Sequence, residues 1–344
     1  MAYEVTIGIP VYNVEKYIRE SLDSALAQTF PYIEFLVCDD CGTDSSILIV
    51  QEYQKTHSRG KDIRVVKQPR NMGLGCARNR MIAEAKGKYI YFMDSDDLLL
   101  PNTIELMYEQ VQKYDAEMVY GSMDRILLYD NGRRIKEADY SYQVFLNKDE
   151  FALWVYEKYD RLQASTCNFL IKLDVYLQNG IHYKPINYWE DFTTTMDLPT
   201  YVTRVVMLPN VTYYYMCRTG SMSNYQQRNH ICKDEILQTM NAMVMIKDNS
   251  ERIQNKPYFS KRMLKVMMTC FYICCTILRH WNKIDPVFKK KELRDFMHYP
   301  VSLKSVCSCR HGCMQHLVLY LLGIVPSSLS VVLMKMVAKH KGLI

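Results

Sequence analysis

The sequence predicts an α/β protein with a mostly parallel central sheet flanked by helices, followed by a C-terminal helical appendage. Three observations predict this. The first ~120 residues alternate short β-rich runs with longer stretches of helical period, as βαβ units do. Two of these runs end in aspartates, where strands of a parallel sheet meet their ligands. Beyond Tyr225, apolar side chains recur at helical spacing.

Five runs in the first part are candidate strands, because each is rich in β-branched and aromatic residues. Between the first two, Ile18, Leu22, Ala25 and Leu26 mark one face of a helix. The runs cover residues 5–12, 33–39, 63–68, 89–94 and 117–122.

Two further helices are expected between these strands. Ile47, Val50 and Tyr53 mark the buried face of one, and Asp44 or Ser45 can cap it. The residues Pro101-Asn102 can open the other.

The pattern changes after residue 124. Short alternating segments surround Asn131-Gly132, and an Asn-Gly pair is a strong hairpin signal. A helical patch is expected next, ending with residues 187–201, and strand character then returns over residues 203–209 and 211–217. We therefore predict an α/β domain over residues 1–225 and a basic helical region over residues 226–344.

Charge is distributed unevenly along the chain, although the formal net charge is only +6. Residues 251–344 hold 16 Lys and Arg against 4 Asp and Glu, whereas the first 250 residues hold 27 against 33. An acidic front half suits cations, and a basic tail suits phosphates of nucleic acid or of anionic lipid. We favour lipid and expect no nucleic-acid partner.

The last 30 residues contain two apolar runs, separated by Pro326-Ser327-Ser328. They are about nine and about seven residues long, short of the roughly 20 needed to span a bilayer. With Lys335, Lys339 and Lys341 near lipid phosphates, this segment could lie on a membrane surface. Equally, these helices could simply pack on the domain.

Twelve cysteines raise the question of disulfides, but the chain begins MAYEVTIGIP, without a basic and apolar leader. A reducing, cytoplasmic setting is therefore expected, with possible peripheral contact at the inner face of the plasma membrane. Cys307, Cys309 and Cys313 lack the paired CxxC spacing of a common zinc site, so reduced thiols are the preferred interpretation.

The stretch FMDSDD places three carboxylates, Asp94, Asp96 and Asp97, directly after an apolar run. Such a cluster is repulsive unless a cation or hydrogen-bond donors compensate it. Mn²⁺ or Mg²⁺, completing its shell with water and substrate phosphates, is the simplest partner. The alternative, an acidic cap on the next helix, explains one aspartate but not three.

A second acidic pair, Asp39-Asp40, ends another predicted strand, so two parallel strands deliver carboxylates to the same edge. Asp40 could accept hydrogen bonds from a nucleotide base or from ribose hydroxyls. The alternative, capping of the next helix by Asp44 alone, leaves Asp40 without a role. Residues 71–78, NMGLGCAR, imitate a dinucleotide fingerprint, but Arg78 replaces its third glycine. A basic residue near a nucleotide is the more economical interpretation of Arg78.

Four stretches together resemble the inverting glycosyltransferases of family 2, which have the Rossmann-like GT-A fold. The resemblance covers roughly residues 3–225, and it depends on the order and combination of the motifs. The stretches are IPVYNVEKYIRESLDSALAQTF, VCDDCGTDSS, NMGLGCARNRMIAEAKGKYIYFMDSDD and NYWEDF.

The resemblance implies a nucleotide-diphospho-sugar donor lying across the strand ends. Asp94-Ser95-Asp96 would be the D-x-D motif, with Asp94 near the ribose and the metal, and Asp96 a ligand of the metal that neutralises the diphosphate. The residues implied for the nucleoside side are Pro10, Tyr12, Glu15, Asp40 and Arg78.

The resemblance also implies a catalytic base, the aspartate of an E-D pair, here Glu190-Asp191. Asp191 would take the proton of the attacking hydroxyl, with Trp189 and Glu190 near the acceptor. From the residues alone, two acids decorating a helix N-terminus would be the preferred interpretation. A later Tyr-x-x-Arg-x-x-Ser stretch implies contacts from Arg218 and Ser221 to the diphosphate.

The sequence therefore predicts a metal-dependent inverting glycosyltransferase that moves a hexosyl or N-acetylhexosaminyl group from a nucleotide sugar, expected to be a UDP-sugar. The expected acceptor is a lipid-linked glycan in the biosynthesis of a cell-surface polysaccharide such as capsule or O-antigen. A nucleotidyltransferase or phosphatase could use the same aspartates but would leave the E-D pair unexplained. A non-catalytic nucleotide-sugar-binding or scaffold subunit is the alternative from another class.

Overall fold

The computed structural model describes residues 2–158, 162–186, 189–218, 230–307, 309 and 311–343. The chain forms two compact units. The sheet unit comprises Met1–Phe151 and Lys158–Ser221, and the helical unit comprises Ala152–Glu157 and Met222–Ile344. The division falls inside helix α5 (Glu150–Glu157), whose first two residues belong to the sheet unit.

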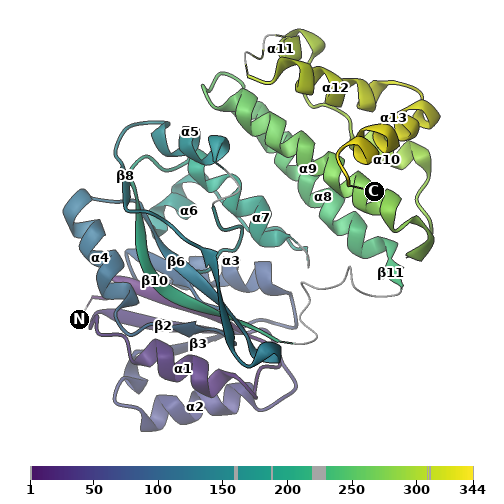
Figure 1. Cartoon of the computed structure of the whole chain (residues 1–344). Coiled ribbons are helices and arrows are strands. Elements are labelled where there is room, and N and C mark those ends of the chain that lie inside the picture. The colour runs from purple at the N-terminus through teal and green to yellow at the C-terminus, as the bar shows by residue number, and fades with distance from the viewer. Residues whose placement is uncertain are drawn as a thin grey trace. The chain divides into compact units, whose positions relative to one another are not determined.

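A mixed sheet forms the core of the sheet unit (Figure 1), in the order β3-β2-β1-β4-β9-β6-β10-β5, with β7 beside β6 and β8 beside β10. The first four strands pair in parallel, as do β6 and β10, which confirms the predicted α/β class. The strands are β1 (Val5–Val11), β2 (Ile33–Asp39), β3 (Ile63–Lys67), β4 (Tyr89–Phe92), β5 (Leu98–Leu99), β6 (Met118–Leu127), β7 (Arg133–Ala138), β8 (Gln143–Phe145), β9 (Phe169–Lys172) and β10 (Val205–Cys217).

Helices cover both faces of this sheet. Side chains of β4 face opposite ways: the Phe92 ring packs 6.5 Å from that of Tyr176 on α6, whereas the Tyr89 ring packs 6.3 Å from that of Tyr108 on α4. The helices of this unit, with the start of α5, are α1 (Ile18–Leu26), α2 (Ser46–Thr56), α3 (Leu74–Glu84), α4 (Thr103–Tyr114), α6 (Leu173–Asn179) and α7 (Glu190–Thr195).

Local patterns predicted several elements well. The predicted face of α1 is buried, and α4 begins after Asn102. The hairpin β6–β7 turns at Asn131-Gly132, where both residues have positive φ, as an Asn-Gly turn requires.

Other predictions were wrong. The helical patch is interrupted by β9, which lies between β4 and β6 and is antiparallel to both. The two late strands form one strand, β10, whose register shifts around Pro209, because proline has no N–H to donate to the ladder. On α2 the buried side is Ser46, Ile49 and Val50 rather than Ile47 and Tyr53.

The helical unit is built mainly on α8 (Lys233–Ser250) and α9 (Phe259–Arg279), which pack against each other as their apolar spacing predicts. Among the described residues, no helix is both long enough and apolar enough to cross a bilayer. The remaining elements are the strands β11 (Ile231–Cys232) and β12 (Ile284–Asp285) and the helices α10 (Lys290–Phe296), α11 (Leu303–Cys307), α12 (Cys313–Ile324) and α13 (Ser327–His340).

Candidate active site

The candidate site lies at the carboxyl ends of the parallel strands. Val11 at the end of β1 pairs with Asp39 at the end of β2, and the Asp40 N–H donates to the Val11 carbonyl at 3.0 Å. After β4, the Met93 N–H donates to the Gly8 carbonyl at 3.1 Å. The loops that follow β1, β2 and β4 therefore meet at one edge of the sheet, as the sequence predicts.

Asp97, the last acid of FMDSDD, has a structural role. Its buried carboxylate accepts a hydrogen bond from Tyr213 Oη at 2.7 Å and another from the Met216 N–H at 2.8 Å, both from β10. Burial raises the pKa of Asp97 well above its ordinary value, and the charges of Asp94 and Asp96 add to the rise. This carboxylate ties the FMDSDD loop to the end of β10.

Asp96 faces the other way, toward Arg218. Arg218 Nη1 donates to Asp96 Oδ2 at 2.7 Å, and Nη2 donates to the Asp96 carbonyl at 2.6 Å. The guanidinium lies 3.9 Å from the centre of the Tyr17 ring, which holds it by a cation–π contact. Arg218 is thus positioned next to the D-x-D motif, while Ser221, its predicted companion, lies outside the described residues.

Arg78 on α3 is fully buried, with 0% of its side chain exposed. Nη2 pairs with Asp94 at 3.3 Å, and Nη1 pairs with Glu190 at 3.3 Å and also with Asp191. This differs from the prediction that Arg78 contacts the donor, because the side chain is covered and points at three carboxylates. Arg78 joins the D-x-D motif to the E-D pair.

Asp191 lies in the first turn of α7 and keeps 21% of its side chain exposed. Besides Arg78, its carboxylate accepts hydrogen bonds from the Thr166 N–H at 3.1 Å and from Thr166 Oγ1 at 3.0 Å. Burial raises the pKa of Asp191, against the opposing effect of Arg78. A fixed, partly accessible carboxylate with a raised pKa is suited to accept a proton.

Glu190 and Trp189 surround this aspartate in different ways. Glu190 is buried, and burial together with the charge of Asp191 raises its pKa to about 7. Trp189 is half-buried, has a φ of 66° and packs its ring 4.9 Å from that of Phe192. The partly exposed Trp189 remains a candidate for contact with the acceptor. The buried position of Glu190 does not favour such a contact.

Asp40 is only 4% exposed. Its Oδ1 accepts the Met72 N–H at 2.8 Å, and its Oδ2 accepts the Gly73 N–H at 2.9 Å. This differs from the prediction that the carboxylate is available to a donor, because both oxygens fix the loop before α3.

The remaining predicted donor residues differ in accessibility. Pro10 is buried within β1, and Ser95 is 6% exposed. Glu15 accepts the Ser45 N–H at 2.9 Å and thereby joins the loops after β1 and β2. Tyr12 is 46% exposed, so its ring is available to a ligand.

The carboxylates of the site could hold a metal only together with oxygen atoms of a bound ligand. No group of three or more His, Cys, Asp or Glu side chains is placed to hold a metal in the part of the chain that the structure describes. Mg²⁺ and similar ions bound with phosphates commonly take only one or two carboxylates. Asp94 and Asp96, with 33% and 41% of their side chains exposed, fit such a shared ion.

The residues that position the acids are not evident from the sequence. Thr166, Tyr213 and Tyr17 each contact an acid or an arginine of the site, but they come from separate parts of the chain. Tyr17 lies within one of the four motif stretches, yet nothing in that stretch marks it as a partner of Arg218. Only their distance in space, not their spacing in sequence, reveals them.

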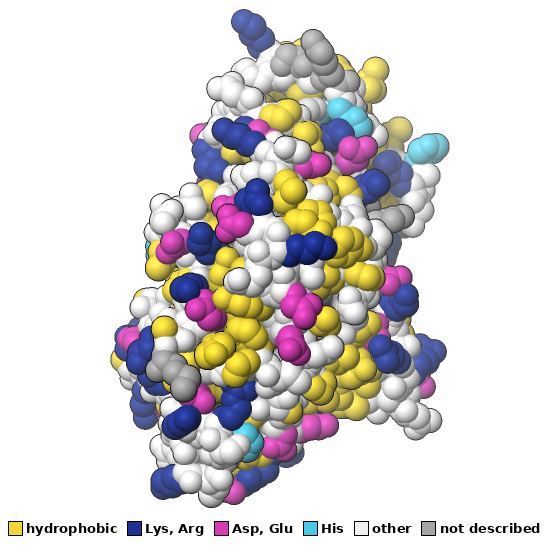
Figure 2. Space-filling model, turned by 90° about the vertical axis from the view of Figure 1, so that its left-hand side faces the viewer, with side chains coloured by type: hydrophobic (Ala, Val, Ile, Leu, Met, Phe, Trp, Pro, Cys, Tyr) yellow, Lys and Arg dark blue, Asp and Glu magenta, His cyan; other side chains and the backbone are white. Residues whose placement is uncertain are grey.

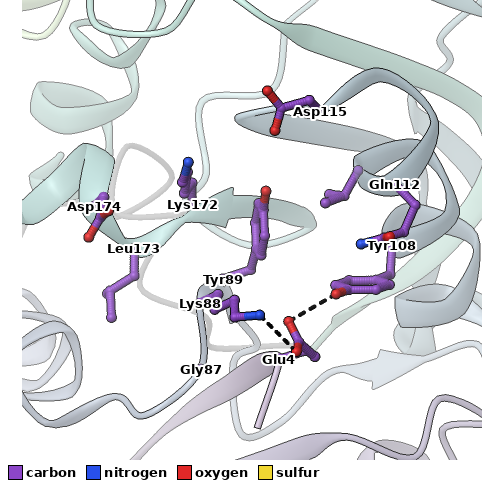
Figure 3. Close-up of a pocket in the computed structure, with 11 residues that line it drawn as sticks. Glu4, Gly87, Lys88, Tyr89, Tyr108, Gln112, Asp115, Lys172, Leu173 and Asp174 are labelled. Carbon is purple, nitrogen blue, oxygen red and sulfur yellow. Dashed lines mark hydrogen bonds and ion pairs between the residues drawn. The ribbon is translucent and has the colours of Figure 1, made fainter. Parts of the chain in front are cut away.

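A pocket of about 440 Å³ lies elsewhere, beside the amino ends of β1 and β4. Figure 3 shows Lys88 and Tyr108 directed at Glu4, whose carboxylate they contact at 3.0 and 2.9 Å. None of the candidate site residues lines this pocket, so it is separate from the site described above.

Comparison with known proteins identifies the family. The family model described as "Glycosyl transferase family 2" matches residues 6–178, half of the chain. The chain is 30% identical over 236 residues to glycosyltransferase GlyG of Streptococcus pneumoniae, a match that covers 64% of this chain and 73% of that protein. Chondroitin synthase of Escherichia coli is 40% identical over 109 residues, which is 32% of this chain and only 15% of that longer protein.

A solved structure shares the fold over nearly the whole chain. S. aureus TarS in complex with UDP superimposes with a TM-score of 0.66 at 18% identity, covering 98% of this chain and 92% of that one. Together with the sheet topology, this likeness confirms the GT-A fold with C-terminal helices. The chain belongs to glycosyl transferase family 2 and is a glycosyltransferase.

Proposed function

We propose that this protein is an inverting glycosyltransferase that uses Asp191 as its base and takes a sugar from a UDP-sugar. The observation that carries the proposal is the buried Arg78, which holds Asp191 and the D-x-D residue Asp94 in one hydrogen-bonded cluster. A base and a leaving-group site must lie close together for a single displacement. The UDP bound by the TarS neighbour agrees with the choice of nucleotide.

The leaving side of the reaction belongs to Asp94, Asp96 and Arg218. The Arg218 guanidinium, already held beside Asp96 by Tyr17, can turn its donors to diphosphate oxygens. A divalent metal held by Asp94 and Asp96 together with the diphosphate would supply Lewis-acid stabilisation of the leaving group. The accessible Tyr12 can stack on the base of the nucleotide.

The attacking side belongs to Asp191. Its carboxylate takes the proton of an acceptor hydroxyl while that oxygen bonds to the anomeric carbon. The bond from this carbon to the diphosphate oxygen breaks with its electron pair, so the nucleoside diphosphate leaves from the opposite face. One displacement inverts the configuration, and the raised pKa of Asp191 makes the carboxylate a better proton acceptor.

We propose a lipid-linked glycan in cell-surface polysaccharide assembly as the acceptor, at the inner face of the plasma membrane. Relatives named for such work support the class of product: chondroitin synthase of Escherichia coli and a putative teichuronic acid biosynthesis glycosyltransferase of Bacillus subtilis. The division at residue 225 remains part of the proposal, with transfer assigned to residues 1–225 and membrane contact to the region after them.

Asp191→Asn tests the base. Because the amide cannot take the proton, sugar transfer should fall by about 10² to 10⁴ fold, while UDP binding stays within about twofold. The matched control is Asp174→Asn, the same chemical change at an exposed residue of α6 beside the separate pocket. Full transfer by Asp191→Asn would refute the base assignment, and UDP binding without any transfer by the native chain would favour a non-catalytic subunit.

A further inference from the structure

Each of the last two helices of the helical unit leaves apolar side chains exposed. On α12, Met314, Val318 and Leu321 follow one another at helical spacing and are 72%, 38% and 41% exposed. On α13, Leu329, Val332 and Met336 do the same at 47%, 52% and 62%. These six residues are called the α12–α13 apolar face.

Packing within the helical unit accounts for the apolar residues on the buried side of these helices, but not for the exposed ones. Leu319 and Leu322 of α12 and Met334 of α13 are almost completely buried, and Ser330 Oγ donates to the Leu322 carbonyl at 2.6 Å. The helices therefore already have their internal contacts. Large apolar side chains that remain exposed on both helices indicate an external partner.

The charged side chains that α12 and α13 themselves carry are all positive. No Asp or Glu follows Asp295 in the sequence, and Lys335 and Lys339 continue the exposed side of α13 after Val332 at spacings of three and seven. Elsewhere the signs are mixed: Figure 2 shows a face on which Lys and Arg side chains lie among Asp and Glu. Charge complementarity therefore favours an anionic partner.

We propose that the α12–α13 apolar face docks this enzyme on a bilayer containing anionic phospholipid. The six side chains enter the boundary between headgroups and acyl chains, and Lys335 and Lys339 reach the phosphates. The helices lie on the membrane, consistent with their length. Docking would give the enzyme access to a lipid-linked acceptor, and this purpose rests on the proposed function. The docking itself is argued from the exposed side chains and charges alone.

Co-sedimentation of the full chain with vesicles tests the proposal. The native protein should bind vesicles of phosphatidylcholine mixed with phosphatidylglycerol, and bind phosphatidylcholine alone at least tenfold more weakly. Leu321→Glu with Val332→Glu should reduce binding to the anionic vesicles at least tenfold. Lys335→Gln and Lys339→Gln should each reduce it by about fivefold, the effect of one cation near such a surface.

Matched controls come from the sheet unit, where Leu48 and Leu177 are 66% and 53% exposed. Leu48→Glu with Leu177→Glu should bind vesicles like the native chain, and both double variants should keep native UDP affinity and helical circular dichroism. Equal binding of the native chain to both vesicle types, or unchanged binding of Leu321→Glu with Val332→Glu, would overturn the proposal. So would self-association of the native chain that the same substitutions abolish, since the face would then bind a second copy.

Vesicle binding and sugar transfer are separate measurements. Vesicle binding without transfer from any nucleotide sugar would contradict the proposed function and leave the docking surface standing. Sugar transfer to a water-soluble acceptor without vesicle binding would contradict the docking surface and leave the glycosyltransferase activity standing.

Discussion

Arg78 provides one positive charge for three carboxylates, those of Asp94, Glu190 and Asp191. If all three were ionised, the buried cluster would carry surplus negative charge, which a low-dielectric interior disfavours. Burial is the main cause of the raised pKa values of these acids, and repulsion between neighbouring carboxylates adds to the rise. Glu190, whose pKa is raised to about 7, is protonated in part near neutral pH.

Arg78→Met should therefore be strongly destabilising. Removal of a buried cation leaves its carboxylate partners unpaired, and we expect the free energy of unfolding to fall by about 3 to 5 kcal/mol. Arg78 also opposes the rise in the pKa of Asp191, so its loss should move the acidic limb of the pH profile of kcat/KM to higher pH. Denaturant unfolding and pH–rate measurements check the two effects.

The neighbouring Arg80 on the same helix is the control. It pairs with Glu84 on the surface at 2.9 Å, so Arg80→Met should cost about 0.5 kcal/mol or less and leave the pH profile unchanged. If Arg78→Met fails to fold, Arg78→Lys retains the charge and supplies the kinetic comparison. Equal stability and equal pH profiles for the two methionine variants would contradict the role given to Arg78.

Glu190 should make stability depend on pH. Its pKa is raised from 4.5 to about 7 in the folded chain, so the folded state binds the proton more tightly than the unfolded state. The stability that this gives is fully present below pH 4.5 and is lost as pH rises through about 7, up to about 3 kcal/mol in all. In urea unfolding from about pH 5 to about pH 8, the native chain should lose stability relative to Glu190→Gln. Parallel curves would contradict this.

At the scale of elements, β9 connects the sheet to the candidate base. This strand lies between β4 and β6, and the segment before it contains Thr166, which donates twice to Asp191. The insertion of β9 thus brings the segment before it, with Thr166, into contact with the E-D pair. The position of Asp191 therefore depends on a strand that the sequence pattern does not predict.

Thr166→Val should test this support. The variant keeps the shape of the side chain and the backbone donor but removes the hydroxyl donor to Asp191. We expect transfer to fall by about tenfold, because one net hydrogen bond to a charged group is worth roughly 1.5 kcal/mol, while UDP affinity remains unchanged. Thr166→Ser retains the hydroxyl and should transfer at near the native rate. Equal rates for both variants would show that the hydroxyl does not position the base.

The sequence predicts those elements and residues whose signal lies within a short stretch of the chain. Strands β1, β2 and β4 are buried at every residue, and their short, mostly apolar runs predict them. Helix α1 buries one face with a helical period, which predicts it equally well. Strand β9 has four residues, too few to show a period, and β10 is interrupted at Pro209. Asp40, Asp94 and Asp96 were identified because they follow strands, and Asp191 only through the family resemblance. The contacts of Arg78, Tyr213 and Thr166 join separate elements, the first two across more than 100 residues, which periodicity does not encode.

At the scale of the whole molecule, the first 250 residues carry a net negative charge and the remaining residues carry a net positive charge. The acidic first 250 residues contain the candidate site for a metal and a diphosphate, and the basic remainder contains the α12–α13 apolar face. The sequence predicted this asymmetry through composition alone. Which side chains remain exposed on α12 and α13 required the packed structure, because helical spacing is the same for a buried and an exposed apolar face.

Ligand binding should stabilise the whole chain in a way that depends on the metal. A ligand that binds only the folded state at about 100 times its Kd adds roughly 2.7 kcal/mol to the free energy of unfolding, so UDP with Mn²⁺ should raise the Tm by several degrees. EDTA should remove most of this shift, because Asp94 and Asp96 then face the diphosphate without the cation between them. Asp96→Asn should reduce the shift with Mn²⁺, whereas Asp174→Asn, on the far pocket, should not. An equal shift from UDP with Mn²⁺ and with EDTA would refute metal dependence and leave Arg218, at 2.7 Å from Asp96, as the cation that neutralises the diphosphate.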